Sequence, residues 1–169
     1  MTADELRLRQ APVKARYKED PSAAVVTLKA EGRVSQESIT CALESGRAGT
    51  PAGLHPATGG DGSAACSGDM LLEALVSCAG VTLAAVATSM GVRLAAATVA
   101  AEGELDFRGT LGVARDAPVG FKAIRLTFSI ETDAPADKVT KLVELAERYC
   151  VVLQTLAKPP SVSVRIGAR

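Results

Sequence analysis

One segment of the chain constrains the fold more than any other. Between Met70 and Met90 almost every residue is small or apolar, and Glu73 is the only charged side chain. A run of this length could cross a membrane. It is rich in Ala, Gly, Ser and Thr, however, and has neither a flanking basic cluster nor an aromatic belt. We therefore expect the buried helix of a folded domain.

The expected helix covers residues 67–90, with Ser67 or Asp69 as its N-cap and Gly91 at its end. Because the helix is apolar nearly all round, we expect it to be buried on nearly all sides. A single small lobe cannot supply that much cover. The pattern therefore predicts a homodimer in which this helix is central.

Strand-like patterns precede this helix. Residues 23–34 and 37–47 are β-rich and are joined by a Gly-containing turn, which predicts a hairpin with Arg33 at or beside the turn. Residues 48–69 contain many Pro, Gly and Ser residues and should be irregular. A loop of that length in a small domain is often functional.

Strands and helices also follow the long helix. Residues 93–107 have a strand-like pattern, and 121–132 alternate clearly between apolar and polar residues. Asp133 is the expected N-cap of the next helix. The remaining elements are a helix, a short helix and a last strand, at residues 133–149, 150–160 and 161–169. This order predicts an α+β protein rather than a regular alternation of strands and helices.

The charge balance argues against two classes of partner. The 169 residues include 19 Lys and Arg against 19 Asp and Glu, and only 3% are aromatic. A nucleic-acid groove or a contact with an anionic membrane would need a basic surface. We expect neither partner and favour small-molecule chemistry. The N-terminus lacks the apolar stretch of a secretory signal, so we expect the protein in the cytoplasm.

Four cysteines, at positions 41, 66, 78 and 150, are the residues with the most evident chemistry. They form no CxxC pair and the only histidine is His55, so we expect no metal site and no cofactor. A reducing cytosol disfavours structural disulfides, and any bridge here would be transient and catalytic. Cys41 alternates with Thr40 in a strand, where packing explains it, and we assign His55 no role.

Two of these cysteines lie in recognisable contexts. Cys78 is in the middle of the long helix, in GDMLLEALVSCAGVTLAAVA, and Cys150 begins a short helix that contains Val152 and Leu156. With the order of the strands, these motifs resemble the OsmC/Ohr family of thiol peroxidases over most of the chain. The resemblance implies one OsmC-like domain over 1–169, with antiparallel sheets around a long central helix, in an intertwined homodimer. Its parts are N-terminal strands at about 23–47, a loop at 48–66, the central helix at about 67–90 and a C-terminal α/β lobe at 93–169.

The resemblance also implies a peroxidase cycle. Cys78, as the thiolate, would attack an organic hydroperoxide and become a sulfenic acid, and Cys150 would condense with it to a disulfide. A dithiol reductant then reduces the disulfide, and in this family a lipoyl-bearing protein can serve. Cys66, in the loop before the long helix, is an alternative thiol partner.

A cation should be needed to ionise a thiol in apolar surroundings. The family uses an arginine from its N-terminal strands, oriented by an acid near the start of the long helix. By its position Arg33 is the candidate for this arginine, and Arg16 and Arg47 are the alternatives. A glutamate is expected nine or ten residues before the reactive cysteine, but Asp69 and Gly68 stand there. Asp69 is thus the candidate acid and Glu73 is the alternative. The absence of the expected glutamate concerns the efficiency of the peroxidase more than the fold.

The residues around Cys78 also bear on the substrate. The residues that flank Cys78 include the apolar side chains Leu71, Leu75, Val81 and Leu83, and none of these carries a basic group. A pocket there would favour alkyl hydroperoxides over hydrogen peroxide. The alternative function is that of a binding or redox-sensing protein on the same fold, in which an apolar pocket takes a ligand and the cysteines are oxidised only incidentally.

Overall fold

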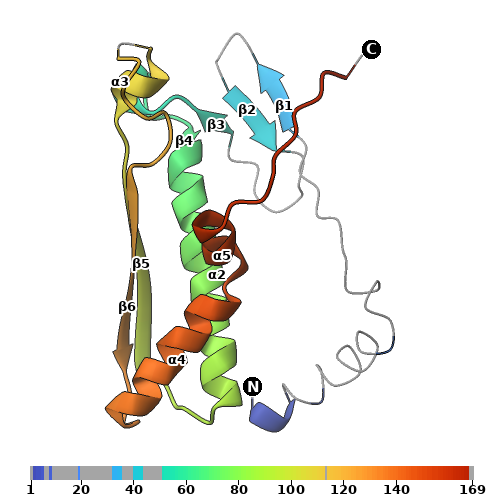
Figure 1. Cartoon of the computed structure of the whole chain (residues 1–169), viewed down its shortest axis with the longest axis vertical. Coiled ribbons are helices and arrows are strands. Elements are labelled where there is room, and N and C mark those ends of the chain that lie inside the picture. Colours follow the sequence, from blue (N-terminus) through green and yellow to red (C-terminus); the bar gives the residue numbers. More distant parts are fainter. Residues whose placement is uncertain are drawn as a thin grey trace.

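The computed structural model describes residues 2–5, 8, 19, 32–35, 40–43, 51–112 and 114–167, with only the backbone described at 32–35, 40–43 and 108. Figure 1 shows a long central helix with a two-stranded hairpin to its left and two shorter helices in front of it. Much of the hairpin expected at 23–47 lies outside the described residues. So do Arg16 and Arg47.

The central helix α2 covers Ser67–Ser89, as the apolar run predicts. Its N-cap is Cys66, which makes no side-chain capping bond, so the expectation of Ser67 or Asp69 as N-cap is wrong. The helix ends as expected, because Gly91 adopts a left-handed φ of 63° that suits glycine. The Val92 N–H then donates to the Ala87 carbonyl at 2.9 Å.

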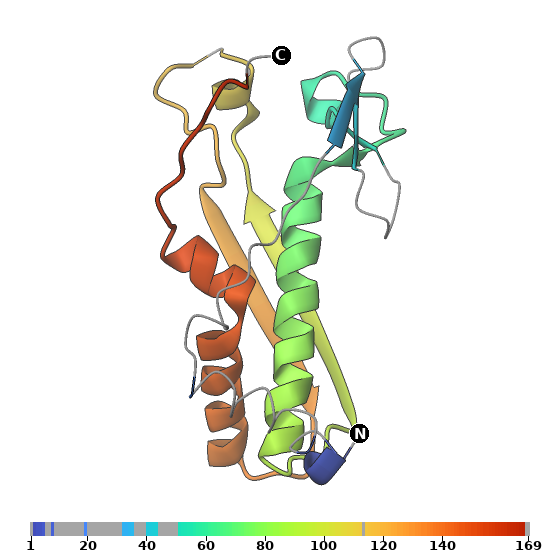
Figure 2. The ribbon, with the colours of Figure 1, turned by 90° about the vertical axis from the view of Figure 1, so that its right-hand side faces the viewer.

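The C-terminal half packs around α2. Strands β5 (Ala96–Glu104) and β6 (Ala123–Glu131) form an antiparallel pair, connected through the short helix α3 (Phe107–Thr110). Helices α4 (Ala136–Tyr149) and α5 (Val151–Ala157) follow. Figure 2 shows α4 and α5 lying alongside α2, with the β5–β6 pair behind them. The structure therefore has a helical layer on a small antiparallel sheet.

A second sheet lies near the start of α2. Its order is β1 (Gly32–Ser35), β2 (Thr40–Leu43), β3 (Ala52–Gly53), β4 (Ala65–Cys66). The β1–β2 pairing is antiparallel, which confirms a hairpin. Arg33 lies within β1 opposite Ala42, and its expected place at the turn is wrong. The segment expected to be irregular contains β3, β4 and a 3₁₀ turn, η2 (Pro56–Thr58).

Two adjoining hydrophobic clusters form the core. One joins the C-terminal half of α2 to α4 through Leu83 and Leu142. The other joins the middle of α2 to the start of α5 through Leu75 and Cys150. The alternation in β6 is confirmed, because its half-buried positions pack on these clusters. They are Ile124, Leu126, Phe128 and Ile130.

A single chain does not bury α2 on nearly all sides, as the apolar pattern led us to expect. The buried residues of α2 lie on one stripe, and Val81, on another face, is 73% exposed. By length and composition α2 could also cross a membrane, with a mean hydropathy of 2.0 over its most apolar window. It packs against β5, β6, α4 and α5, and 22% of that window is buried within the chain.

Two further expectations are wrong. Helix α4 begins at Ala136 with Pro135 as its N-cap, so Asp133 is not the cap. A residue that precedes a proline is disfavoured in the helical conformation, so the helix does not start at Ala134. Residues 161–167 form no strand. Val162, Val164 and Ile166 are 84–98% exposed. A strand needs a pairing partner as well as an alternating pattern, and no described strand pairs with this segment.

Candidate thiol site

The fold brings Cys78 and Cys150 together. Cys78 lies in the middle of α2, and Cys150 is the N-cap of α5. Cys150 is fully buried, whereas Cys78 is half-buried. The two residues pack in one cluster with Leu75 and Ala79, and each sulfur is within hydrogen-bonding reach of the other. Both are free thiols.

The environment favours ionisation of Cys78. Burial on its own raises the pKa of this thiol. The backbone N–H of Val152, the thiol of Cys150 and the backbone N–H of Val151 donate toward the Cys78 sulfur, and the Thr82 hydroxyl adds a fourth donor. These donors outweigh burial and hold the pKa of Cys78 below its ordinary value. The first N–H groups of α5 can make these bonds because they have no partner within the helix.

Cys150 responds in the opposite direction. Burial raises the pKa of its thiol, and the Leu153 N–H opposes this rise only in part. The neighbouring Cys78 raises the pKa of Cys150 further, both as a hydrogen-bond partner and as a negative charge. Two thiolates this close repel each other, so one proton remains on the pair. Once one proton has left the pair, the favoured arrangement has Cys78 as the thiolate and the Cys150 S–H donating to it.

A cavity of about 580 Å³ adjoins the cluster around the thiols. Five of its lining residues also pack in that cluster: Leu75, Ile124, Leu126, Leu153 and Leu156. Lys122, Glu147 and Gln154 supply its polar lining, and neither thiol is among the lining residues. The cavity can therefore take a hydrocarbon group close to the pair.

The residues that line this cavity differ from those expected around Cys78. Leu75 lines the cavity, but Leu83 packs in the other core cluster. Val81 is largely exposed and Leu71 is 36% exposed. Residues near each other in a helical sequence spread around the axis at about 100° per residue. Most of the lining comes instead from β6 and α5, which the sequence around Cys78 cannot reveal.

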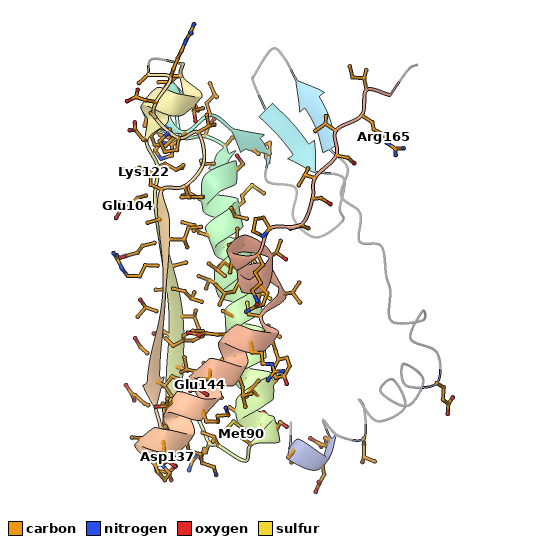
Figure 3. All side chains as sticks on the ribbon, viewed as in Figure 1. Met90, Glu104, Lys122, Asp137, Glu144 and Arg165 are labelled. Carbon is orange, nitrogen blue, oxygen red and sulfur yellow. The ribbon has the colours of Figure 1, made fainter. Side chains whose placement is uncertain are left out.

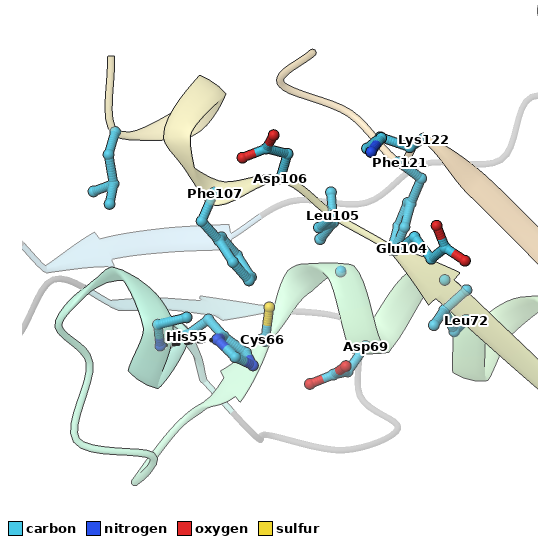
Figure 4. Close-up of a pocket in the computed structure, with 14 residues that line it drawn as sticks. His55, Cys66, Asp69, Leu72, Glu104, Leu105, Asp106, Phe107, Phe121 and Lys122 are labelled. Carbon is cyan, nitrogen blue, oxygen red and sulfur yellow. Dashed lines mark hydrogen bonds between the residues drawn. The ribbon is translucent and has the colours of Figure 1, made fainter. Parts of the chain in front are cut away.

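A larger cavity, of about 840 Å³, lies at the start of α2. Figure 4 shows Cys66, Asp69, His55 and Phe107 among the residues that line it. The His55 ring stacks on Phe107 with centroids 4.9 Å apart, and its Nδ1 accepts the Ala57 N–H at 3.0 Å. These contacts account for His55 structurally. Cys66 lies away from the thiol pair, in this second cavity.

Comparison with known proteins identifies the family. A family model described as OsmC-like protein matches residues 60–165, which is more than half of the 169 residues. The chain belongs to the OsmC-like family. Its fold is accordingly the α+β OsmC-like fold, with a long central helix and antiparallel strands. No curated protein matches the chain.

Solved structures of OsmC-like proteins share this fold. An OsmC-like protein from Mycoplasma pneumoniae is 14% identical, with a TM-score of 0.64 over 79% of this chain and 89% of that one. The organic hydroperoxide resistance protein OsmC of Legionella pneumophila is 18% identical, with a TM-score of 0.62 over 80% and 92%. OhrB of Bacillus subtilis, also an organic hydroperoxide resistance protein, is 19% identical, with a TM-score of 0.54 over 80% and 94%. At such identities the likeness is one of fold.

The arginine and the acid that the family resemblance implies stay predictions. The side chain of Arg33 lies outside the described residues. Asp69 is exposed in the first turn of α2, and at about 1.5 Å of rise per residue it lies about 13 Å along the helix from Cys78. Glu73 is also exposed. The described donors to the Cys78 sulfur are neutral groups. The sequence analysis expected a cation and did not predict these donors.

The signal for these donors is weak in the sequence. A cysteine just before a short helix indicates free N–H groups at the helix start. Nothing in the sequence shows that α5 docks with those groups against the middle of α2. The sequence could have shown Thr82 as a neighbour of Cys78, because residues four apart lie on the same face of a helix. Within the described residues, no three His, Cys, Asp or Glu side chains cluster as a metal site requires.

Proposed function

We propose that this OsmC-like protein is a cysteine-based peroxidase that reduces organic hydroperoxides. The observation that carries the proposal is the thiol pair, in which Cys78 is the more easily ionised member and Cys150 the protonated one. A thiolate is the nucleophile in thiol chemistry, and a neighbouring thiol is what a sulfenic acid needs to form a disulfide. Membership of a family that includes organic hydroperoxide resistance proteins supports the same function.

The cycle has three balanced steps. The Cys78 thiolate attacks the terminal oxygen of the hydroperoxide, the O–O bond breaks, and the alkoxide takes up a proton and leaves as the alcohol. Cys78 is now a sulfenic acid, which condenses with the Cys150 thiol to form an S–S bond and release water. A dithiol then exchanges with the disulfide, becomes a disulfide itself and restores both thiols. A lipoyl-bearing protein fits the role of that dithiol.

The apolar cavity beside the pair supports a preference for alkyl hydroperoxides. Each buried CH₂ contributes about 0.8 kcal/mol, so three or four of them amount to roughly a hundredfold preference over hydrogen peroxide. We expect tert-butyl, cumene and fatty-acid hydroperoxides to exceed hydrogen peroxide in kcat/KM. Stopped-flow oxidation of the reduced protein measures this, and an equal or faster reaction with hydrogen peroxide contradicts it.

A homodimer is part of the proposal. On α2, Val81 is 73% exposed although the helix is central. The β5–β6 pair has no third strand within the described residues. The extended segment at 161–167 alternates exposed apolar residues with polar ones, a pattern suited to pairing with another strand. A second copy of the chain would cover the helix face and supply strands to the open sheet edges.

The test is turnover. Purified protein is given cumene hydroperoxide and dithiothreitol, and loss of hydroperoxide is followed over many equivalents. Wild type and the matched control Cys66→Ser should turn over alike, because Cys66 lies in the other cavity. Cys78→Ser should consume no hydroperoxide. An absence of turnover in wild type would instead favour the binding or sensing alternative, with the 580 Å³ cavity as its ligand site.

A further inference from the structure

Two neighbouring residues line both of the cavities described above. The 580 Å³ cavity beside the thiol pair and the 840 Å³ cavity at the start of α2 share Phe121 and Lys122 among their lining residues. Phe121 comes just before β6 and is half-buried. Figure 4 shows it among the side chains around the larger cavity. The two cavities therefore adjoin at this point of the chain.

Two glycines leave the space that the Phe121 ring occupies. A Cβ built at Gly103, in β5, would overlap the ring. A Cβ built at Gly68, in the first turn of α2, would lie 3.5 Å from the Cζ atom of Phe121. The ring therefore extends from the sheet to the start of the central helix. An aromatic ring packed between two elements in this way closes the space between them.

The ring is at the end of the smaller cavity that is remote from the thiols. Leu126, which also lines this cavity, packs in the cluster of Cys78 and Cys150, whereas Phe121 lies against the start of α2. Gly68 precedes Cys78 by ten residues, which is about 15 Å of helix. A hydrocarbon group whose reacting end is at Cys78 can therefore extend toward Phe121.

We propose that Phe121 determines substrate length, because its ring closes the apolar cavity and limits the chain that can be buried beside the thiol pair. A fully extended chain advances roughly 1.2 Å per bond, so about 12 bonds cover the distance to the ring. Up to that length each added CH₂ strengthens binding. A longer chain meets the ring and gains nothing further. The inference rests on the proposed function for its role in catalysis.

The larger cavity offers apolar contacts on the other side of the ring. Leu72 and Leu105 both line it. The Cδ1 atom of Leu72 is 3.3 Å from a Cβ built at Gly103, and that of Leu105 is 3.5 Å from a Cβ built at Gly68. Both leucines thus lie beside the Phe121 ring. Without the ring the two cavities would join, and two further methylenes buried there would increase affinity roughly tenfold.

The experiment measures dissociation constants of saturated fatty acids, from octanoate to palmitate, by isothermal titration calorimetry. It uses the reduced full chain and stays below the critical micelle concentrations. In wild type the affinity should rise with chain length and level off near laurate. In Phe121→Ala it should continue to rise, so that myristate binds about tenfold more tightly than laurate. The matched control is Leu111→Ala, which removes a side chain that lines the larger cavity but not the smaller one. It should level off as wild type does.

Two results would overturn the inference. One is an affinity that rises without a break through palmitate in wild type. The other is an unchanged plateau in a folded Phe121→Ala protein, because some other group would then close the cavity. Circular dichroism checks the fold, and Phe121→Leu, with a smaller gain for myristate, replaces Phe121→Ala if that variant is unfolded.

A turnover measurement separates this inference from the proposed function. Phe121→Ala should raise kcat/KM for tetradecyl hydroperoxide about tenfold relative to octyl hydroperoxide, through KM and not kcat. Absence of turnover in wild type with either hydroperoxide would instead contradict the proposed function. A protein that shows the plateau and its loss in Phe121→Ala, but no turnover, keeps Phe121 as the limit of a binding cavity and loses the peroxidase assignment.

Discussion

At the scale of single residues, the two thiols differ because of where hydrogen-bond donors point. Burial raises the pKa of both thiols, but Cys78 receives the first N–H groups of α5, whereas the charge of Cys78 acts on Cys150. In the proposed cycle, this asymmetry makes Cys78 the nucleophile and Cys150 the protonated thiol that resolves the sulfenic acid. Within the described residues, the donors to the Cys78 sulfur come from α2, from α5 and from Cys150 between them, and an arginine would strengthen the division.

The asymmetry predicts an order of titration. Because the pKa of Cys78 is lowered and the pKa of Cys150 is raised, alkylation of Cys78 should reach its plateau at a lower pH than in the unfolded chain. Alkylation of Cys150 should reach its plateau at a higher pH than in the unfolded chain. Peptide-resolved alkylation in buffer and in urea measures both. The reverse order would contradict the assignment of roles.

At the scale of elements, Gly103 in β5 allows the sheet to approach its neighbours. A Cβ at this position would lie 2.4 Å from the ring of Phe121, and Phe121 lines both cavities. Figure 3 places the neighbouring Glu104 and Lys122 at the same end of the hairpin, far from Met90 at the end of α2. The missing side chain of Gly103 therefore leaves the space that the Phe121 ring occupies.

Substitution of Gly103 tests this packing. Gly103→Ala should lower the free energy of unfolding by about 1–3 kcal/mol, the usual cost of overpacking. Gly120→Ala is the matched control, because its Cβ meets nothing within 4 Å while the change in backbone freedom is the same. Urea denaturation measures both variants. Equal stabilities would mean that Phe121 moves aside without cost.

The sequence predicts most elements where one local pattern suffices. The apolar run predicts α2, and the alternation around Phe128 predicts β6. Expectations failed where a partner decides the outcome. Pro135, and not Asp133, is the N-cap of α4. The strand expected at 161–169 has no pairing partner among the described residues. The pairing of Cys78 with Cys150 followed from family resemblance, whereas the donors that ionise Cys78 depend on how α5 docks.

At the scale of the whole molecule, one chain leaves its central helix incompletely covered. Val81 remains largely exposed three residues after Cys78. Exposed apolar surface over a central element is typical of an interface. If the second copy covers this face, it also limits access of water to the thiol pair, so assembly and chemistry would be linked.

The mass in solution tests assembly. Light scattering should give about twice the chain mass of 17.3 kDa. Val81→Glu would bury a charge in the proposed interface and should shift the protein toward monomer. Val119→Glu, at a loop position that is 65% exposed, should leave the mass unchanged. A wild-type monomer at micromolar concentration would contradict the homodimer.

The most direct measurement is the fate of the thiols after one equivalent of cumene hydroperoxide. Peptide mapping without reduction should show a disulfide between Cys78 and Cys150, formed within one chain because the two sulfurs meet there. The oxidised protein should therefore run as a monomer on a denaturing, non-reducing gel. Cys150→Ser should stop after one oxidation, with a sulfenic acid on Cys78. A disulfide through Cys66, or no oxidation of Cys78, would contradict the account.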